Sequence, residues 1–174
     1  PAMIFQQLTK REVADDKKAQ AALTKEWDRL KGRTTWLEGT VEEQSVVADR
    51  APRDGVNVHF GRIFGFAGIK GRELPESTRK YKGRVVFQGN QVRDESGLAA
   101  VFSEQASGSS HLQASRLLDI VARAPGCAGQ QADAVSAYTQ ALLYGDGRTT
   151  PVDTWITLPP DQQPPSWRRF RHPV

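Results

Sequence analysis

The chain has 174 residues, of which 24 are Lys or Arg and 20 are Asp or Glu, so its formal net charge is +4. This length can form one domain with a sizeable core. The sequence holds neither a signal-peptide pattern nor an apolar run near the ~20 residues of a membrane helix. Its single cysteine excludes an internal disulfide framework and indicates a reducing compartment. We therefore expect an intracellular protein of the cytoplasm or the nucleus, not secreted and not inserted in a membrane.

Residues 1–19 form a leader to which the sequence assigns no structure, apart from a helix start near Asp15. Four apolar residues then recur at helical spacing, namely Ala19, Leu23, Trp27 and Leu30. This periodicity predicts an amphipathic helix over about residues 15–31, with Trp27 in the core, that ends at Gly32. The pair Asp15-Asp16 lies at its beginning, where carboxylates favour the helix dipole. We therefore interpret the pair as a helix start rather than as a catalytic motif.

A basic β-hairpin is predicted over about residues 56–88, after a stretch that carries mainly turn signals, residues 32–56. In its second strand, alternation puts Lys80, Lys82 and Arg84 on one face and apolar residues on the other. Such a row of cations can hold phosphates. It is also typical of a solvated strand face that discourages edge pairing, and the hairpin alone favours this second interpretation.

Residues 109–144 are expected to form a helix and a short strand that present Asp133. The helix is predicted to begin at Ser110, which has a capping-box spacing to Gln113, and to stop at Pro125-Gly126. The strand would follow at residues 127–134, with Cys127 as a small buried residue. Three further segments are expected downstream: a strand at residues 154–158, an extended Pro-rich run at residues 159–165 and a basic, frayed end at residues 167–172.

Four short stretches carry patterns that occur together in one protein family. They are Glu26-Trp27 with Trp36, the run Tyr81-Lys82-Gly83-Arg84-Val85-Val86, the motif Gln131-x-Asp133-x-x-x-Ala137-Tyr138, and the segment Trp155-Ile156-Thr157-Leu158-Pro159-Pro160. In this order they resemble the opening helix, a fingers strand, the first catalytic motif and the segment after it in copia-type retrotransposon reverse transcriptases. The resemblance covers roughly residues 20–165 and indicates the amino-terminal part of such an enzyme.

The resemblance implies an α+β fold of the right-hand polymerase type. Residues 20–108 would form a fingers-like region that contains the basic hairpin. Residues 109–174 would form the start of the palm, with the first catalytic motif and a Pro-rich, basic end. The family's second catalytic motif, an aromatic residue followed by x-Asp-Asp, is absent from the 174 residues. We therefore expect the chain to be truncated before that motif and to be inactive as this fragment.

The resemblance also implies roles for single residues in template-directed nucleotidyl transfer by a two-metal mechanism. Asp133 would be the catalytic carboxylate. Together with the Ala134 carbonyl it would bind Mg²⁺ or Mn²⁺, in a completed palm only. Nucleotide binding is implied for Lys82, Arg84, Tyr138 and Ala134, and nucleic-acid binding for Arg79, Lys80 and Arg93. The implied partners are an RNA template, a DNA primer, dNTP and the remainder of a polyprotein.

Two other functions are compatible with the same residues. One is a noncatalytic nucleic-acid-binding module derived from such an element, in which Asp133 is a relic. Departures from the family pattern, such as Ala134-Val135 in place of Val-Lys, indicate a diverged copy. The other is a protein-interaction domain whose positive charge serves solubility alone. The sequence leaves the template preference and the oligomeric state open.

Overall fold

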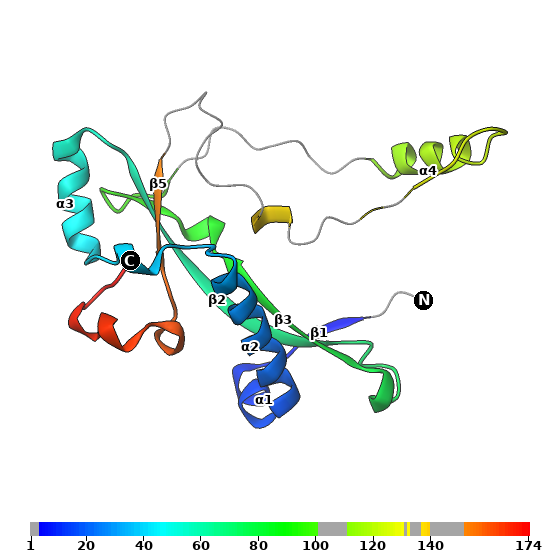
Figure 1. Ribbon diagram of the computed structural model, residues 1–174, viewed down its shortest axis with the longest axis horizontal. Helices are drawn as coiled ribbons and strands as arrows, with labels where there is room; N and C mark the ends of the chain where they lie inside the picture. The colour runs from blue at the N-terminus through cyan, green and yellow to red at the C-terminus, as the bar shows by residue number, and fades with distance from the viewer. Residues whose placement is uncertain (1–3, 101–110, 131, 133–136, 140–151) are drawn as a thin grey trace. The chain divides into compact units, whose positions relative to one another are not determined.

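The computed structural model describes residues 4–100, 111–130, 132, 137–139 and 152–174 (Figure 1). The chain forms two compact units: unit 1 comprises residues 1–100 and 143–174, and unit 2 comprises residues 101–142. The described elements are helices and a mostly antiparallel sheet, which confirms the expected α+β class. The expected boundary between residues 108 and 109 lies outside the described residues. Residues 152–174, which the sequence groups with the second region, pack in unit 1.

The sheet of unit 1 is built around one long strand, β2 (Val58–Lys70) (Figure 1). Its carboxyl-terminal half pairs antiparallel with β1 (Phe5–Gln7) on one edge and with β3 (Lys80–Phe87) on the other. Its amino-terminal half pairs antiparallel with β4 (Arg93–Asp94) and parallel with β5 (Asp153–Thr157). β2 and β3 form the predicted hairpin, and β5 corresponds to the predicted downstream strand. The sequence pattern does not predict β1, which lies in the leader.

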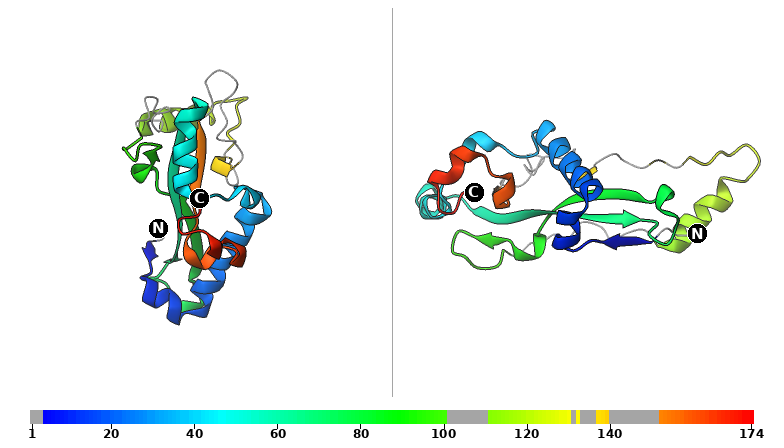
Figure 2. Two further views of the ribbon diagram at one scale, coloured as in Figure 1. Left: turned by 90° about the vertical axis from the view of Figure 1, so that its left-hand side faces the viewer. Right: turned by 90° about the horizontal axis from the view of Figure 1, so that it is seen from below.

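Two consecutive helices, α1 (Lys10–Asp15) and α2 (Lys17–Gly32), cover one face of the β1–β2–β3 part of the sheet (Figure 2). A capping box begins α1, because the Thr9 hydroxyl accepts from the Glu12 amide and the Glu12 carboxylate accepts from the Thr9 amide. The Asp16 carboxylate caps α2 by accepting from two amides of its first turn. The prediction of a helix start at the aspartate pair is confirmed.

Two glycines allow α2 to lie close to the sheet. A Cβ at Gly83 would lie 2.4 Å from the Ala22 carbonyl oxygen, and a Cβ at Gly65 would lie 2.8 Å from Trp27 Nε1. Trp27 is only 3% exposed, which confirms its predicted place in the core. The other buried members of this core are Ile63, Leu158 and Trp167.

Residues 32–56 contain a helix, α3 (Gln44–Asp54), that the sequence pattern does not predict. Pro52 lies inside it and its first turn lacks a side-chain cap, so the usual local signals are weak. Val47 and Ala51 of this helix instead pack against Val58, Phe60 and Val174 in a second core. Tertiary packing of an apolar face therefore stabilises the helix.

The carboxyl-terminal segment also packs on unit 1. A 3-10 turn, Pro160–Gln162, interrupts the predicted extended run at residues 159–165, and a second turn, Pro165–Arg169, begins at its last residue. Trp167 and Val174 are each 5% exposed and belong to the two cores. The Glu43 carboxylate accepts from the amides of Arg171 and His172, at 2.7 and 2.8 Å. The prediction of a frayed end is therefore wrong, because the tail contributes buried side chains and its backbone is held.

In unit 2 the described α-helix is α4 (Leu112–Val121), which ends before Pro125-Gly126 as predicted. Its N-cap is His111, which makes no side-chain hydrogen bond to the helix, and Ser110, at which a capping box was predicted, lies outside the described residues. The large apolar side chains of α4 are exposed, by 50–70%, namely Leu112, Leu117, Leu118, Ile120 and Val121. Neither α4 nor any other helix in the described parts of the chain is long and apolar enough to cross a membrane.

The segment after α4 differs from the prediction where it is described. Residues 127–130 form no strand, and most of the remaining predicted strand lies outside the described residues. Cys127 is exposed, so the expectation that it is buried is wrong. The segment around Cys127 is exposed throughout and has no described core to enter.

Candidate nucleic-acid interface

The row of cations predicted on the second strand of the hairpin lies on one exposed face of β3. Lys80, Lys82 and Arg84 are exposed, whereas Tyr81 and Gly83 between them point toward α2. Side chains alternate along a strand, so the contacts of the intervening residues with the helix determine that the cations point away from it. The predicted placement of the three cations on one face is confirmed.

Two cations of β2 join this row. In the antiparallel register Lys70 lies directly opposite Lys80, and alternation along β2 brings Arg62 to the same face. No carboxylate of the described residues forms an ion pair with any of the five side chains. We call Arg62, Lys70, Lys80, Lys82 and Arg84 the basic face.

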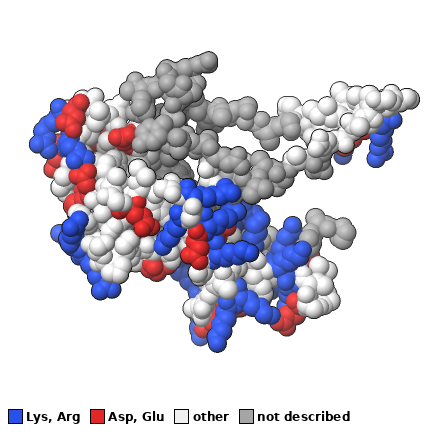
Figure 3. Space-filling model, viewed as in Figure 1, with Lys and Arg blue, Asp and Glu red and all other residues white. Residues whose placement is uncertain are grey.

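The helix side of the same unit has a different charge pattern. Figure 3 has the view of Figure 1, in which α2 lies in front of the sheet, and it shows Lys and Arg interspersed with Asp and Glu. An ion pair, Lys18–Glu76, joins the helix to the hairpin loop on that side. Such a mixture of charges is typical of an ordinary solvated surface. The basic face differs from it, because no carboxylate in the described part of the chain forms an ion pair with its cations.

Two other cations implied by the resemblance lie apart from Lys80, Lys82 and Arg84. The Arg79 Nε donates to the Leu74 carbonyl at 2.9 Å and so closes the hairpin loop. Arg93 lies on β4, opposite Phe60, and its Nη1 donates to the Gly97 carbonyl at 2.6 Å. Phe60 lies two residues from Arg62 on β2, but ten residues, or about 33 Å at the usual rise of a strand, from Lys70, which pairs with Lys80. The structure therefore groups Lys82 and Arg84 with Lys80, but neither Arg79 nor Arg93 with them.

Tyr81 of β3 also interacts with Asp16 at the start of α2. The Tyr81 hydroxyl donates to the Asp16 carboxylate, which also caps the helix. This bond stabilises the ionised carboxylate and the neutral phenol, so it lowers the pKa of Asp16 and raises the pKa of Tyr81. Because Tyr81 lies between Lys80 and Lys82, the bond helps to keep both cations on the far face.

The residues to which the resemblance assigns catalysis and metal binding, Asp133 and Ala134, lie outside the described residues. Tyr138 belongs to a 3-10 turn, Ala137–Thr139, and the structure describes the backbone of Tyr138 but not its side chain. Among the described residues, no group of three or more His, Cys, Asp or Glu side chains could hold a metal ion. The catalytic and magnesium-binding roles, and the nucleotide-binding roles of Tyr138 and Ala134, therefore stay predictions.

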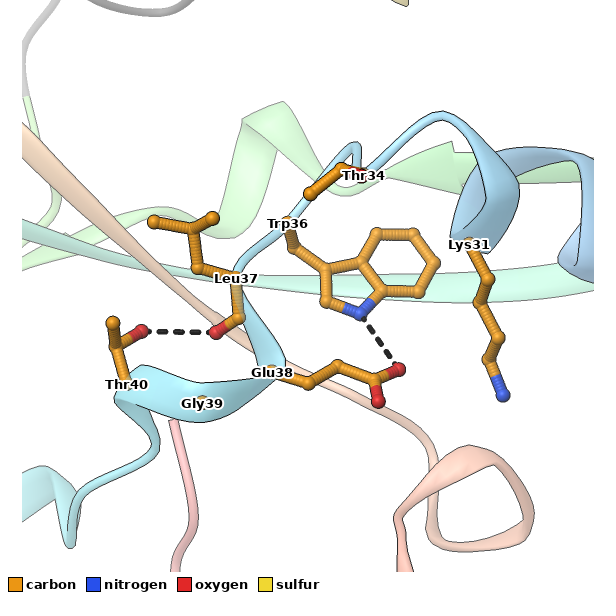
Figure 4. Close-up of a pocket in the computed structure, with 7 residues that line it drawn as sticks. All are labelled: Lys31, Thr34, Trp36, Leu37, Glu38, Gly39 and Thr40. Carbon is orange, nitrogen blue, oxygen red and sulfur yellow. Dashed lines mark hydrogen bonds between the residues drawn. The ribbon is translucent and has the colours of Figure 1, made fainter.

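A separate pocket of about 450 Å³ lies in the loop after α2 (Figure 4), lined by Lys31, Thr34, Trp36, Leu37, Glu38, Gly39 and Thr40. The Trp36 Nε1 donates to the Glu38 carboxylate at 3.4 Å, and the Thr40 hydroxyl donates to the Leu37 carbonyl at 2.9 Å. These bonds use polar groups of the pocket within the loop itself. The pocket therefore presents no convergent set of side chains for a reaction.

Comparisons of the chain with protein-family models, with curated proteins and with solved structures find no match. The basic face and the packing of the hairpin are thus the observations from which a function can be inferred.

Proposed function

We propose that this chain is the amino-terminal part of a copia-type reverse transcriptase and that unit 1 supplies its fingers-like, nucleic-acid-binding surface. The basic face carries this proposal, since it combines five exposed cations without an ion-pairing carboxylate among the described residues. Phosphates suit such a face, because Arg offers a planar fork and Lys a compact point charge. Lys82 and Arg84 take the phosphates of the incoming nucleotide, and Lys80 takes the nucleic-acid backbone.

The packing of unit 1 supports the proposal. Trp27 and Trp36, from the first stretch that resembles the family, pack edge to face with ring centroids 6.1 Å apart. Val85 from the second stretch and Leu158 from the fourth belong to the same core. Stretches that are 50 to 130 residues apart in the chain thus meet in one packed body, as parts of one ancestral domain would.

The exposed side chains of α4 support the palm part of the proposal. A contiguous apolar face of this kind is normally buried against further protein. In the proposed enzyme the remainder of the palm covers it. Asp133 and Ala134 hold Mg²⁺ or Mn²⁺ only in that completed palm.

Salt dependence of binding to an RNA–DNA duplex tests the proposal. Each phosphate contact contributes about 0.7–0.9 to the slope of log affinity against log salt. Changing Lys80, Lys82 and Arg84 together to Gln is expected to flatten this slope by roughly two units. The matched control changes Lys17, Lys25 and Lys31 on α2 to Gln, which alters the net charge equally and is expected to leave the slope nearly unchanged. Equal slopes in the two triple variants would show that the basic face is only a solvated strand face.

A noncatalytic nucleic-acid-binding module is the second candidate, and the departure at Ala134-Val135 from the family motif favours it. This module would use the same basic face, so the salt experiment does not separate it from the enzyme. The reading frame beyond Val174 does separate the two. An aromatic-x-Asp-Asp motif there would support the enzyme, and its absence over the length of a palm would support the module.

A further inference from the structure

The sheet face that carries the cations also carries a row of aromatic rings. Phe5 of β1 and Phe66 of β2 have ring centroids 6.5 Å apart, and Phe66 and Phe64 have centroids 6.1 Å apart. Phe5 and Phe64 are each 38% exposed. We call Phe5, Phe66 and Phe64 the aromatic strip. The helices α1 and α2 pack on the opposite face, and α3 packs at the other end of β2, so no described helix of unit 1 covers the strip.

The Phe5 ring of the strip is held in place by packing against neighbouring residues of the sheet. The Phe5 ring lies over Gly68 of the central strand, where a Cβ would come within 2.4 Å of its Cζ. Gly68 therefore makes room for the ring. On the far side the Arg84 guanidinium lies 5.8 Å from the ring centroid, a cation–π distance. A residue of an edge strand is thus held toward the middle of the basic face.

The cations surround the strip and repel one another. Lys70 is opposite Phe5 on one side and opposite Lys80 on the other. Like charges on directly opposed residues of a sheet are unfavourable, and no carboxylate of the described residues offsets this pair. An anionic ligand would relieve this repulsion. Negative charge that lies beside exposed aromatic rings is therefore the chemistry that the face fits.

We propose that this face binds a single strand of nucleic acid, whose unpaired bases stack on the aromatic strip while its phosphates lie on the surrounding cations. The inference rests on the proposed function, and it specifies that the nucleic acid bound by the basic face is single-stranded. Sites for single strands combine a positive groove with aromatic side chains, because every base has a ring face and every nucleotide a phosphate. A duplex would meet only the cations, since its bases are stacked within it.

The test uses the full chain with three probes of about 12 nucleotides, within the ~4–16 nucleotides of single-strand sites. They are oligo-dT, a strand of the same length without bases, and an RNA–DNA duplex. Phe64→Leu and Phe66→Leu are each expected to weaken oligo-dT binding about tenfold and to leave the other two probes unaffected. Phe87→Leu is the matched control, because Phe87 is 41% exposed but alternates to the other face of β3. It is expected to change none of the affinities.

Two results would overturn the inference. One is an equal loss for oligo-dT and for the strand without bases, because the rings would then support only the fold. The other is no loss with oligo-dT, which would point to a different occupant of the strip, such as the apolar face of α4 or a second copy of the chain. Failure of the proposed function would appear separately. The salt slope for binding to the duplex would then be the same in the wild type and in the triple variant of Lys80, Lys82 and Arg84.

A second measurement uses the unmodified protein and does not depend on how the variants fold. The NMR signals of the Phe64 and Phe66 ring protons are expected to shift when oligo-dT is added, because a stacked base changes their magnetic environment. The strand without bases is expected to leave the signals in place. Ring signals that stay unshifted at saturating oligo-dT would overturn the inference.

Discussion

Gly83 shows at the scale of one residue how the orientation of the basic face is decided. A Cβ at this position would lie 2.4 Å from the Ala22 carbonyl oxygen and 2.7 Å from the Leu23 Cα, and these backbone atoms cannot turn aside. Gly83→Ala is therefore expected to lower the free energy of unfolding by about 1–3 kcal/mol in a urea titration. The control Gly89→Ala, where nothing lies within 4 Å of the added carbon, is expected to stay within about 0.5 kcal/mol. Similar losses in both variants would argue against the close approach.

The Tyr81–Asp16 hydrogen bond makes part of the stability depend on pH. Because the pKa of Asp16 is lowered in the folded state, its contribution is present above the ordinary aspartate value of about 3.9 and is lost as the pH falls through the lowered pKa. Tyr81→Phe removes the largest cause of this shift. An NMR titration of the Asp16 carboxyl is therefore expected to give a higher pKa in the variant than in the wild type. Identical pKa values would show that the amides of α2 alone hold the carboxylate.

At the scale of elements, β2 contributes buried side chains to cores on both faces of the sheet. Val58 and Phe60 pack on α3, whereas Ile63, Ala67 and Ile69 face α2 and its neighbours. The buried face of β2 thus changes along the strand. In the carboxyl-terminal half, the face that points away from α2 is covered by no described helix of unit 1. The aromatic strip and most of the basic face lie on or beside that half, and Arg62 lies just before it.

The attachment of the tail to α3 gives a prediction at the same scale. The Glu43 carboxylate accepts from the Arg171 and His172 amides, so Glu43→Ala is expected to speed hydrogen exchange at these two amides by about tenfold. Glu38→Ala is the control, since its carboxylate accepts a longer bond, 3.4 Å, from Trp36 within its own loop. Exchange rates measured by NMR that are already fast in the wild type would contradict the docked tail.

At the scale of the whole molecule, the chain is expected not to extend a primer by itself. Asp133 supplies one carboxylate to the proposed site, and the 174 residues contain no aromatic-x-Asp-Asp motif. A site for two divalent ions needs further oxygen ligands, and losing one ion is expected to reduce the rate by thousands-fold or more. Primer extension on a poly-rA template with Mg²⁺ or Mn²⁺ measures this directly. Activity that is present in the wild type and vanishes in Asp133→Asn would mean that another acid completes the site.

Elements with a strong local pattern could be predicted, and elements that depend on distant contacts could not. The helix around Trp27 has apolar residues at helical spacing, and the hairpin has alternating side chains, so each pattern reflects the geometry of the element itself. α3 and β1 lack such patterns. Val47 of α3 is buried by Val174, and Phe5 of β1 pairs with Lys70, so both elements form through partners far away in the chain.

The sequence by itself determined that Lys80, Lys82 and Arg84 share one face, because side chains alternate along any strand. It also determined the α+β class, through a helical and a strand-like periodicity in the same chain. Only the tertiary structure decided that the shared face points away from α2, through the contacts of Tyr81 and Gly83 with the helix. Only the register of β2 brought Lys70 beside Lys80, and only the pairing of β1 placed Phe5 over Gly68. These neighbours are 10 to 63 residues apart in the chain, so their meeting depends on strand pairing and leaves no local signal in the sequence.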